Sequence, residues 1–206
     1  MPEEAASQID FYYARSGNSL RAAIALELCG IPFRKHELDL SKDAQKTEAY
    51  VAINPAGHVP ALVLTMSDGC VTLPQSGAIM EYLLLKHRPD LFPKAEIARA
   101  TCNAVFLAAL SDVAIQNALS RYLSSNVHAA NFVFDRMLSD LRALFEPVKT
   151  ASYLCGGRLS IADYAHFPVV YMRAPQLRKL SGFTHVLSWL DIISTDPAVV
   201  RAVAYS

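Results

Sequence analysis

A polar turn near the N-terminus carries the first side chains that could do chemistry. Arg15-Ser16-Gly17-Asn18-Ser19 follows a short aromatic run and precedes a helical pattern. Hydroxyl and amide groups at a helix N-terminus can stabilise a developing anion. A free thiol has a pKa of about 8.5, and a hydrogen-bond donor beside a helix N-terminus could hold a bound thiol as its thiolate. In the alternative, Ser16, Asn18 or Ser19 only caps the helix.

A second turn leads from residue 54 into an apolar run. It reads Asn-Pro-Ala-Gly-His, and Val59-Pro60 follows directly. Because proline cannot donate to a strand ladder, a Val-Pro step at this place is unusual. A cis Val59–Pro60 bond is one solution, and it would leave the Val59 N–H and C=O free to pair with an extended peptide. The local sequence favours the other solution, a trans proline that opens an edge strand.

A third segment, Pro74-Gln75-Ser76-Gly77, precedes another helical pattern. We expect Ser76 at the N-cap position, where the free N–H groups and the partial positive charge of the helix suit a carboxylate. Gln75 adds an amide that both donates and accepts. A serine at this position can also do no more than cap its own helix, so this segment alone does not identify a ligand.

A fourth segment, Leu159-Ser160-Ile161-Ala162-Asp163, has the pattern of a helix N-terminus. Ser160 followed three residues later by Asp163 resembles a capping box in which an aspartate replaces the usual Glu or Gln. We interpret this pair as a helix start rather than as a site of chemistry.

The elements that must position these segments differ between the two halves of the chain. In the first half, apolar periodicity and turn residues indicate the order β-α-β, then β-β-α, which predicts a mixed sheet with a crossover helix. Strands are expected at 9–13, 33–40, 60–64 and 70–73, and helices at 20–28 and 76–86.

The second half shows helical patterns and no convincing strand. Helices are expected at 98–122, 129–144, 161–172 and 183–193. The segment 87–93 holds two prolines and separates the halves. We therefore predict an α/β domain over 8–86, a linker over 87–95 and an all-helical domain over 96–206.

Composition excludes several classes of protein. A formal net charge of +0 and a pI near 7.0 argue against a nucleic-acid binder. No apolar run reaches the length of a membrane-spanning helix, and the N-terminus lacks the pattern of a secretory signal. Isolated cysteines at 29, 70, 102 and 155 form no C-x-x-C pair and are typical of small core residues in a reducing compartment, most simply the cytoplasm.

The order of these segments resembles the glutathione transferase superfamily. The resemblance rests on N-P-x-G-x-V-P-A-L from Asn54, Q-S-x-A-I from Gln75, S-I-A-D-Y from Ser160, and a tail with Trp189-Leu190 and Asp196-Pro197. It covers the chain from Phe11 to Ala202. It implies a thioredoxin-like domain that binds glutathione, followed by an all-helical domain that contributes the pocket for an electrophile.

The resemblance also implies roles for individual residues. The backbone of Val59, before a cis Pro60, would pair with the cysteinyl part of glutathione. Gln75 and Ser76 would hold the γ-glutamyl end, and His58 would contact the glycine carboxylate. No metal is implied.

The residue that activates the thiol is where this sequence departs from the nearest classes. The run from Arg15 to Leu26 looks most like the zeta class, and the beta class shares the preceding Tyr-Tyr-Ala; both place a cysteine where Asn18 stands. Since Asn18 cannot form a mixed disulfide, thiol-exchange chemistry is disfavoured. Ser16 is the first candidate donor and Asn18 the second. Tyr12 and Tyr13 are further candidates, because some classes use a tyrosine near the end of the first strand.

The activity that the resemblance implies is transfer of glutathione to small hydrophobic electrophiles. A zeta-like isomerase or dehalogenase and a non-catalytic regulatory or interaction protein are the alternatives. The electrophile pocket is expected around 104–112 and 164–171. A homodimer is expected by analogy with the family.

Overall fold

The computed structural model describes residues 6–205, which divide into two compact units. The chain up to Arg88 and the segment from Ala198 onward form the first unit, and Pro89–Pro197 forms the second. The helix α9 (Pro197–Val203) therefore lies almost wholly in the first unit, whereas the sequence pattern had grouped it with the helical domain.

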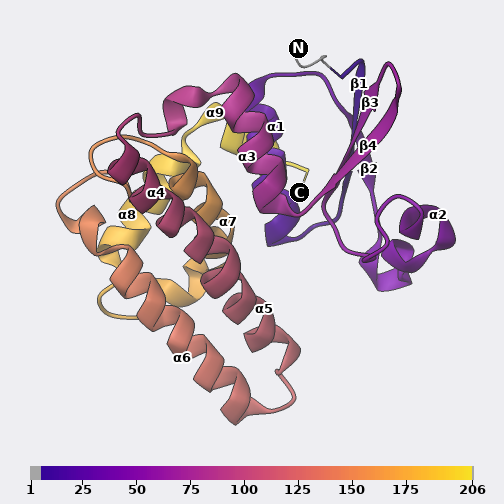
Figure 1. The fold of residues 1–206 in the computed structure, drawn as a ribbon. Coiled ribbons are helices and arrows are strands. Elements are labelled where there is room, and N and C mark those ends of the chain that lie inside the picture. Colours follow the sequence, from indigo (N-terminus) through magenta and orange to yellow (C-terminus); the bar gives the residue numbers. More distant parts are fainter. Residues whose placement is uncertain (1–5, 206) are drawn as a thin grey trace. The chain divides into compact units, whose positions relative to one another are not determined.

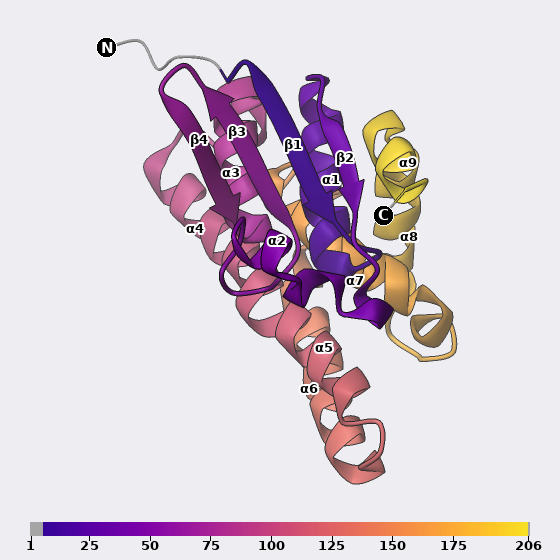
Figure 2. The same ribbon diagram turned by 90° about the vertical axis from the view of Figure 1, so that its right-hand side faces the viewer.

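A four-stranded mixed sheet in the order β2-β1-β3-β4 forms the centre of the first unit (Figures 1 and 2). Its strands are β1 (Gln8–Tyr13), β2 (Arg34–Glu37), β3 (Ala61–Met66) and β4 (Gly69–Pro74). β1 and β2 are parallel, and β3 runs antiparallel to both β1 and β4. The mixed sheet with its crossover helix confirms the fold class expected from the sequence.

Two helices, α1 (Gly17–Cys29) and α3 (Ser76–His87), pack together on the face of the sheet that lies behind the strands in Figure 2. The α1 residues from Ser19 to Leu26 are all buried, so this helix is surrounded by protein on nearly all sides. It ends where Gly30 takes a left-handed conformation, with φ of 62°, as the glycine in the sequence predicts.

Several boundaries differ from the predicted ones. The strand expected at 33–40 ends at Glu37, because short 3₁₀ turns and the helix α2 (Glu48–Val51) occupy the connection to the next strand. Ser76 is the first helical residue of α3, and Gln75 holds the N-cap position that we had expected for Ser76. Hydrophobic periodicity shows where a helix or strand lies better than it shows the first and last residues of that element.

The second unit is made of helices. These are α4 (Glu96–Ala108), a π-helical turn (Ala109–Val113), α5 (Ala114–Tyr122), α6 (Val127–Leu144), α7 (Ile161–Leu177) and α8 (Thr184–Ser194). α7 extends five residues beyond the predicted end at 172. The expected capping box at its start is present, and Ser160 and Asp163 are both buried.

The stretch Glu96–Tyr122 is unusually exposed for its apolar character. Contrary to the expectation from the sequence, it is long and apolar enough, by length and composition alone, to cross a membrane. Its most apolar window of 18 residues has a mean hydropathy of 1.3, and 28% of that window is buried. Its exposed apolar side chains follow helical spacing and include Ile97, Leu107, Ile115 and Tyr122. The apolar residues of this stretch therefore lie partly on the surface and partly in the core.

Candidate functional site

The strand register places the ends of all four strands at one edge of the sheet. Tyr12 lies opposite both Ala61 and His36, and Ala61 lies opposite Pro74. Because β1 and β2 end there, β3 begins there and β4 ends there, the four connecting segments leave the sheet together. The segments are 14–16, 38–41, 58–60 and 75–76, which bring three of the sequence motifs to one place.

The N-terminus of α1 lies at this edge, and Ser16 is its N-cap. The Ser16 hydroxyl accepts a hydrogen bond from the Ser19 N–H at 3.2 Å and donates to the Ser19 Oγ at 3.0 Å. Ser19 Oγ in turn accepts from the Ala14 N–H at 3.2 Å. Capping uses a lone pair of Ser16 and not its proton, so this hydroxyl can cap the helix and still donate to an anion.

The N-terminus of α3 lies at the same edge and is joined to α1 by Arg21. This guanidinium is fully buried, and its Nη1 donates to Asn18 Oδ1 at 2.8 Å and to Ser76 Oγ at 3.1 Å. Burial lowers the pKa of Arg21 to about 10, which still leaves the group charged at neutral pH. Asn18 is exposed, and Arg21 donates to its side-chain oxygen, which leaves its NH₂ group to donate to a ligand.

Gln75 has a strained backbone between β4 and α3. Its φ is 72° and its ψ is 120°, which is uncommon for a residue other than glycine. Such conformations cost about 1–3 kcal/mol and cluster at functional sites. The Gln75 side chain is exposed at the sheet edge, whereas that of Ser76 is buried against Arg21.

Two side chains stabilise the turn before β3 by hydrogen bonds to its backbone. Tyr50 Oη and Asn54 Nδ2 both donate to the His58 carbonyl, each at 2.7 Å. The Val59–Pro60 bond is cis, which is the solution that local sequence had disfavoured and the family resemblance implied. Within residues 6–205, the Val59 N–H and C=O make no backbone hydrogen bond, so both can pair with an extended ligand. The His58 side chain is exposed.

The two tyrosines of β1 point to opposite faces of the sheet. Tyr13 is buried, stacks on Phe11 at 5.2 Å, and burial raises its pKa. Tyr12 stacks on His36 at 4.5 Å and lies beside Tyr50, and burial raises its pKa as well. Both rings are therefore fixed by packing, whereas Ser16 and Asn18 stand at the helix N-terminus itself.

A pocket of about 530 Å³ lies at the ends of β1 and β2. Its lining comes from the ends of β1 and β2 and the loop that follows, namely Ala14, Arg15, Glu37, Leu38, Asp39, Leu40 and Ser41. Two of these lining residues, Arg15 and Glu37, form an ion pair at 3.4 Å. Among the described residues, no group of His, Cys, Asp and Glu could hold a metal ion.

Sequence reasoning missed two residues that build this edge. Arg21 is a charged residue inside a helix, and nothing local shows that its side chain is buried. Tyr50 belongs to a connection without clear periodicity. The closest signal for Arg21 is the strongly apolar run that surrounds it from Leu20 to Leu26, in which a cation is out of place unless it has buried partners.

Two family models match this chain. A glutathione S-transferase N-terminal domain model matches residues 15–84, and a glutathione S-transferase C-terminal domain model matches residues 110–197.

Curated relatives have similar lengths. Glutathione S-transferase 1 of Zea mays is 28% identical over 203 residues, which cover 92% of each chain. The glutathione S-transferase-like protein tpcF of Aspergillus fumigatus is 29% identical, and the match covers 93% of each chain.

Solved structures share the fold. A glutathione transferase family member from Pseudomonas fluorescens, solved with two glutathione bound, superposes with a TM-score of 0.87 at 20% identity, covering 100% of this chain and 96% of that one. A possible glutathione S-transferase from Rhodopseudomonas palustris superposes with a TM-score of 0.80 at 27% identity, covering 93% and 96%.

Proposed function

Because the chain belongs to the glutathione S-transferase superfamily, we propose that it binds glutathione at the sheet edge and transfers the thiolate to small hydrophobic electrophiles. One observation carries this proposal: two helix N-termini meet at the edge where the Val59 backbone is free to pair. The proposed glutathione-binding domain is 8–86, joined through 87–95 to the substrate domain that begins at 96.

The proposed binding mode uses one feature for each part of the tripeptide. The Val59 N–H and C=O pair with the cysteinyl residue as an added strand would. Gln75 and Ser76, with the N-terminus of α3, hold the γ-glutamyl carboxylate. His58 contacts the glycine carboxylate. Glutathione is a co-substrate in this scheme, and no metal takes part.

Ser16 is the proposed activating residue. The thiol proton leaves to solvent, and the Ser16 hydroxyl turns its proton from Ser19 Oγ to the sulfur, while Ser16 Oγ continues to accept the capping bond from the Ser19 N–H. The partial charge at the N-terminus of α1 stabilises the same anion. Asn18 is the second candidate, because Arg21 occupies its side-chain oxygen and leaves its NH₂ group to donate. The nucleophile then belongs to glutathione, and the protein supplies orientation and charge stabilisation.

We propose that side chains of the second unit bind the electrophile. The sequence proposed two lining segments, 104–112 and 164–171. Most of the second segment, from Tyr164 to Val170, is buried. The exposed large apolar side chains in these segments are Leu107 and Tyr171. The π-helical turn at Ala109–Val113 adds support, because such turns are frequent at functional sites.

We further propose that the protein is a cytoplasmic homodimer. The exposed apolar face of Glu96–Tyr122 supports association with another protein surface. The family resemblance implies that this partner is a second copy of the chain. All four cysteines are free thiols, which suits a reducing compartment.

Calorimetry and one assay test the proposed activity. We expect glutathione to bind the wild type at millimolar concentrations or below and a generic aryl halide to be conjugated. In Ser16→Ala, the pKa of bound glutathione, followed by the ultraviolet absorbance of the thiolate, should rise by about one unit, which corresponds to about 1.4 kcal/mol. Ser139→Ala, which changes an exposed serine of α6, is the matched control.

The outcomes separate the alternatives. Absence of glutathione binding would reject both the transferase and a zeta-like isomerase or dehalogenase. Binding without conjugation or isomerisation would identify a non-catalytic protein. Wild-type rates in both Ser16→Ala and Asn18→Ala would show that neither residue activates the thiol.

A further inference from the structure

One backbone carbonyl in the turn before β3 accepts two side-chain hydrogen bonds. The His58 C=O accepts from Tyr50 Oη and from Asn54 Nδ2, each at 2.7 Å. Both donor residues are buried, each with 4% of its surface exposed. Because a carbonyl oxygen has two lone pairs, these two donors occupy both and fix the direction of the carbonyl.

The same peptide unit carries the Val59 N–H. Among the described residues, the bond between Val59 and Pro60 is the one cis peptide bond, so the bond between His58 and Val59 is trans. In a planar trans peptide the N–H points away from the C=O. The Val59 N–H is therefore directed away from Tyr50 and Asn54, and no residue within 6–205 accepts a hydrogen bond from it.

The two donors also change the strength of the Val59 N–H as a donor. Hydrogen bonds to a carbonyl polarise the whole peptide group, and bonds linked through one group reinforce each other by about 10–30% per bond. Tyr50 and Asn54 thus set both the direction of the Val59 N–H and its capacity to donate.

Tyr50 is itself held by aromatic contacts from the sheet. Its ring lies 5.9 Å from the ring of Tyr12, which stacks on His36 with ring centroids 4.5 Å apart. Burial raises the pKa of Tyr50 above its usual value of 10, so the hydroxyl keeps the proton that it donates. In this arrangement the Tyr12 ring supports Tyr50, and through it the turn.

We propose that Tyr50 and Asn54 are positioning residues for glutathione, because by holding the His58 carbonyl they orient the Val59 N–H toward the cysteinyl carbonyl of the tripeptide. This role rests on the proposed function, in which the Val59 backbone pairs with the cysteinyl residue. Neither side chain touches the ligand. Both should therefore affect the affinity for glutathione and not the reactivity of the bound thiolate, which depends on Ser16 in the same scheme.

Tyr50→Phe removes one of the two donors and keeps the ring beside Tyr12. We expect the dissociation constant for glutathione, measured by calorimetry, and the KM for glutathione to rise roughly fivefold. The kcat at saturating glutathione should stay within about twofold of the wild type, because the group that activates the thiol is unchanged.

Tyr205→Phe is the matched control. Tyr205 also belongs to the first unit, and its hydroxyl donates to Glu27 Oε1 at 3.2 Å rather than to the turn before β3. The control therefore loses a tyrosine hydroxyl that is hydrogen-bonded within the same unit. Its dissociation constant and KM for glutathione should equal those of the wild type.

A change in the ligand tests the orientation of the Val59 N–H directly. An analogue of glutathione in which a trans alkene replaces the cysteinyl–glycine peptide bond lacks the carbonyl that would accept from Val59. The wild type should bind this analogue roughly tenfold more weakly than glutathione, and Tyr50→Phe should reduce that ratio to about threefold. A general loosening of the turn would weaken both ligands by the same factor, so an unchanged ratio would overturn the proposal.

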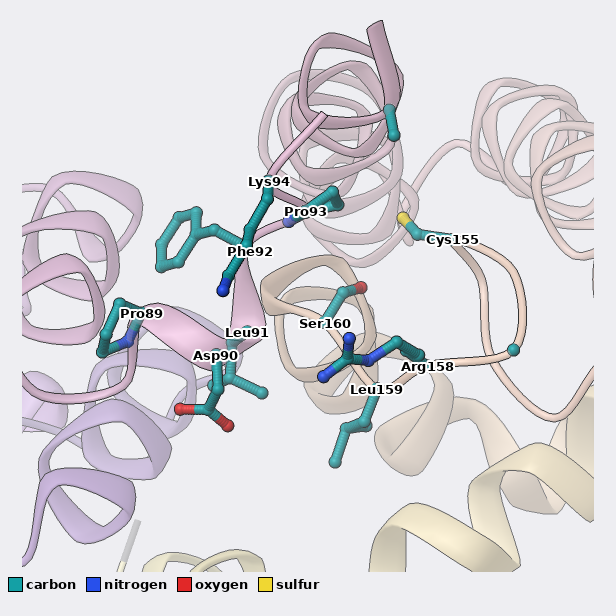
Figure 3. Close-up of a pocket in the computed structure, with 12 residues that line it drawn as sticks. Pro89, Asp90, Leu91, Phe92, Pro93, Lys94, Cys155, Arg158, Leu159 and Ser160 are labelled. Atoms are coloured by element: carbon teal, nitrogen blue, oxygen red, sulfur yellow. The ribbon is translucent and has the colours of Figure 1, made fainter. Parts of the chain in front are cut away.

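Glutathione bound elsewhere would not report on Val59, and the second unit has a cavity that could attract an anion. This pocket of about 650 Å³ is lined by Lys94 and Arg158, and Figure 3 shows both side chains reaching into it. Arg158→Gln removes one of these cations and should leave the dissociation constant for glutathione unchanged. Weaker binding in Arg158→Gln, together with wild-type affinity in Tyr50→Phe, would overturn the proposal.

The outcomes separate the positioning role from the function on which it rests. Absence of glutathione binding to the wild type would reject the proposed function and the positioning role together. Equal affinity in wild type and Tyr50→Phe, or a fall in kcat with unchanged KM, would reject the positioning role alone. If Tyr50→Phe does not fold, Asn54→Asp removes the other donor and keeps the oxygen that accepts from the Ala56 N–H at 3.3 Å. The same rise in KM and the same fall in the ratio are expected there.

Discussion

Arg21 of α1 donates a hydrogen bond to Ser76 Oγ of α3 at 3.1 Å, with both side chains buried. The same guanidinium nitrogen holds Asn18 at 2.8 Å. A buried cation thus joins the two helix N-termini at the sheet edge. It adds positive charge where both the thiolate and the γ-glutamyl carboxylate of glutathione are proposed to lie.

Replacement of Arg21 by Met should weaken glutathione binding and the fold together. Hydrogen bonds to a charged group contribute about 1.5–3 kcal/mol, so we expect the free energy of unfolding to fall by about 2–4 kcal/mol. The dissociation constant for glutathione should rise roughly tenfold, because Ser76 and Asn18 lose the group that orients them. Urea denaturation and calorimetry measure the two effects.

Arg99→Met is the control for Arg21, since Arg99 is an exposed arginine of α4. It should leave both quantities within about 0.5 kcal/mol of the wild type. Unchanged glutathione affinity in a folded Arg21→Met protein would show that Arg21 does not contribute to glutathione binding.

Asp10 on β1 should make the first unit sensitive to acid. Hydrogen bonds from Arg34, at 2.7 and 2.8 Å, and from His36, at 2.6 Å, hold the pKa of Asp10 well below its usual 3.8, although burial opposes them. A depressed pKa in the folded state stabilises the protein above the unfolded value, and this contribution disappears as the pH falls below about 3.8.

The difference in stability between wild type and Asp10→Asn should therefore be largest near neutral pH and should shrink on acidification. Chemical denaturation at a series of pH values measures it. Asp68→Asn, an exposed carboxylate in the turn between β3 and β4, is the control and should show no such trend. A difference that grows on acidification would contradict this account.

Asp163 should be the most sensitive single position of the second unit. Its buried carboxylate accepts from the Leu154 N–H, the Ser160 N–H, the Ser160 Oγ and the Trp189 Nε1, at 2.8–2.9 Å. Burial raises the pKa of Asp163, and these donors oppose that effect. In Asp163→Ala the donors lose their acceptor inside the protein, so we expect a loss of about 3–5 kcal/mol.

Thermal and urea unfolding check this expectation. Asp135→Ala, which removes an exposed carboxylate of α6, should change stability by less than about 0.5 kcal/mol. A cost below about 1 kcal/mol for Asp163→Ala would mean that solvent replaces the lost acceptor.

The exposed apolar face of Glu96–Tyr122 should control the oligomeric state. Ile115 is 52% exposed on α5, and a buried charge at a dimer interface is strongly unfavourable. We expect Ile115→Glu to shift the protein from dimer to monomer, as measured by light scattering during size-exclusion chromatography. Ile192→Glu, at an exposed position of α8, should remain dimeric. A monomeric wild type would reject the proposed dimer.

Strand, helix and capping patterns predicted much of this fold, because each depends only on residues that are close together in the sequence. Alternating strand and helix patterns located the mixed sheet, and Ser160 with Asp163 predicted the start of α7 because both partners lie within one turn. The predicted strand at 33–40 was too long, since a 3₁₀ turn begins at Leu40 and is capped by the side chain of Asp39.

By itself, the sequence determined the order of the elements, the family and the identities of the residues proposed to bind glutathione. Only the tertiary structure decided that Val59–Pro60 is cis and that Arg21 lies buried between Asn18 and Ser76. The physical reason is the same in each case. A residue's type and its near neighbours express helix and strand preference, whereas burial and pairing arise when segments distant along the chain are packed together.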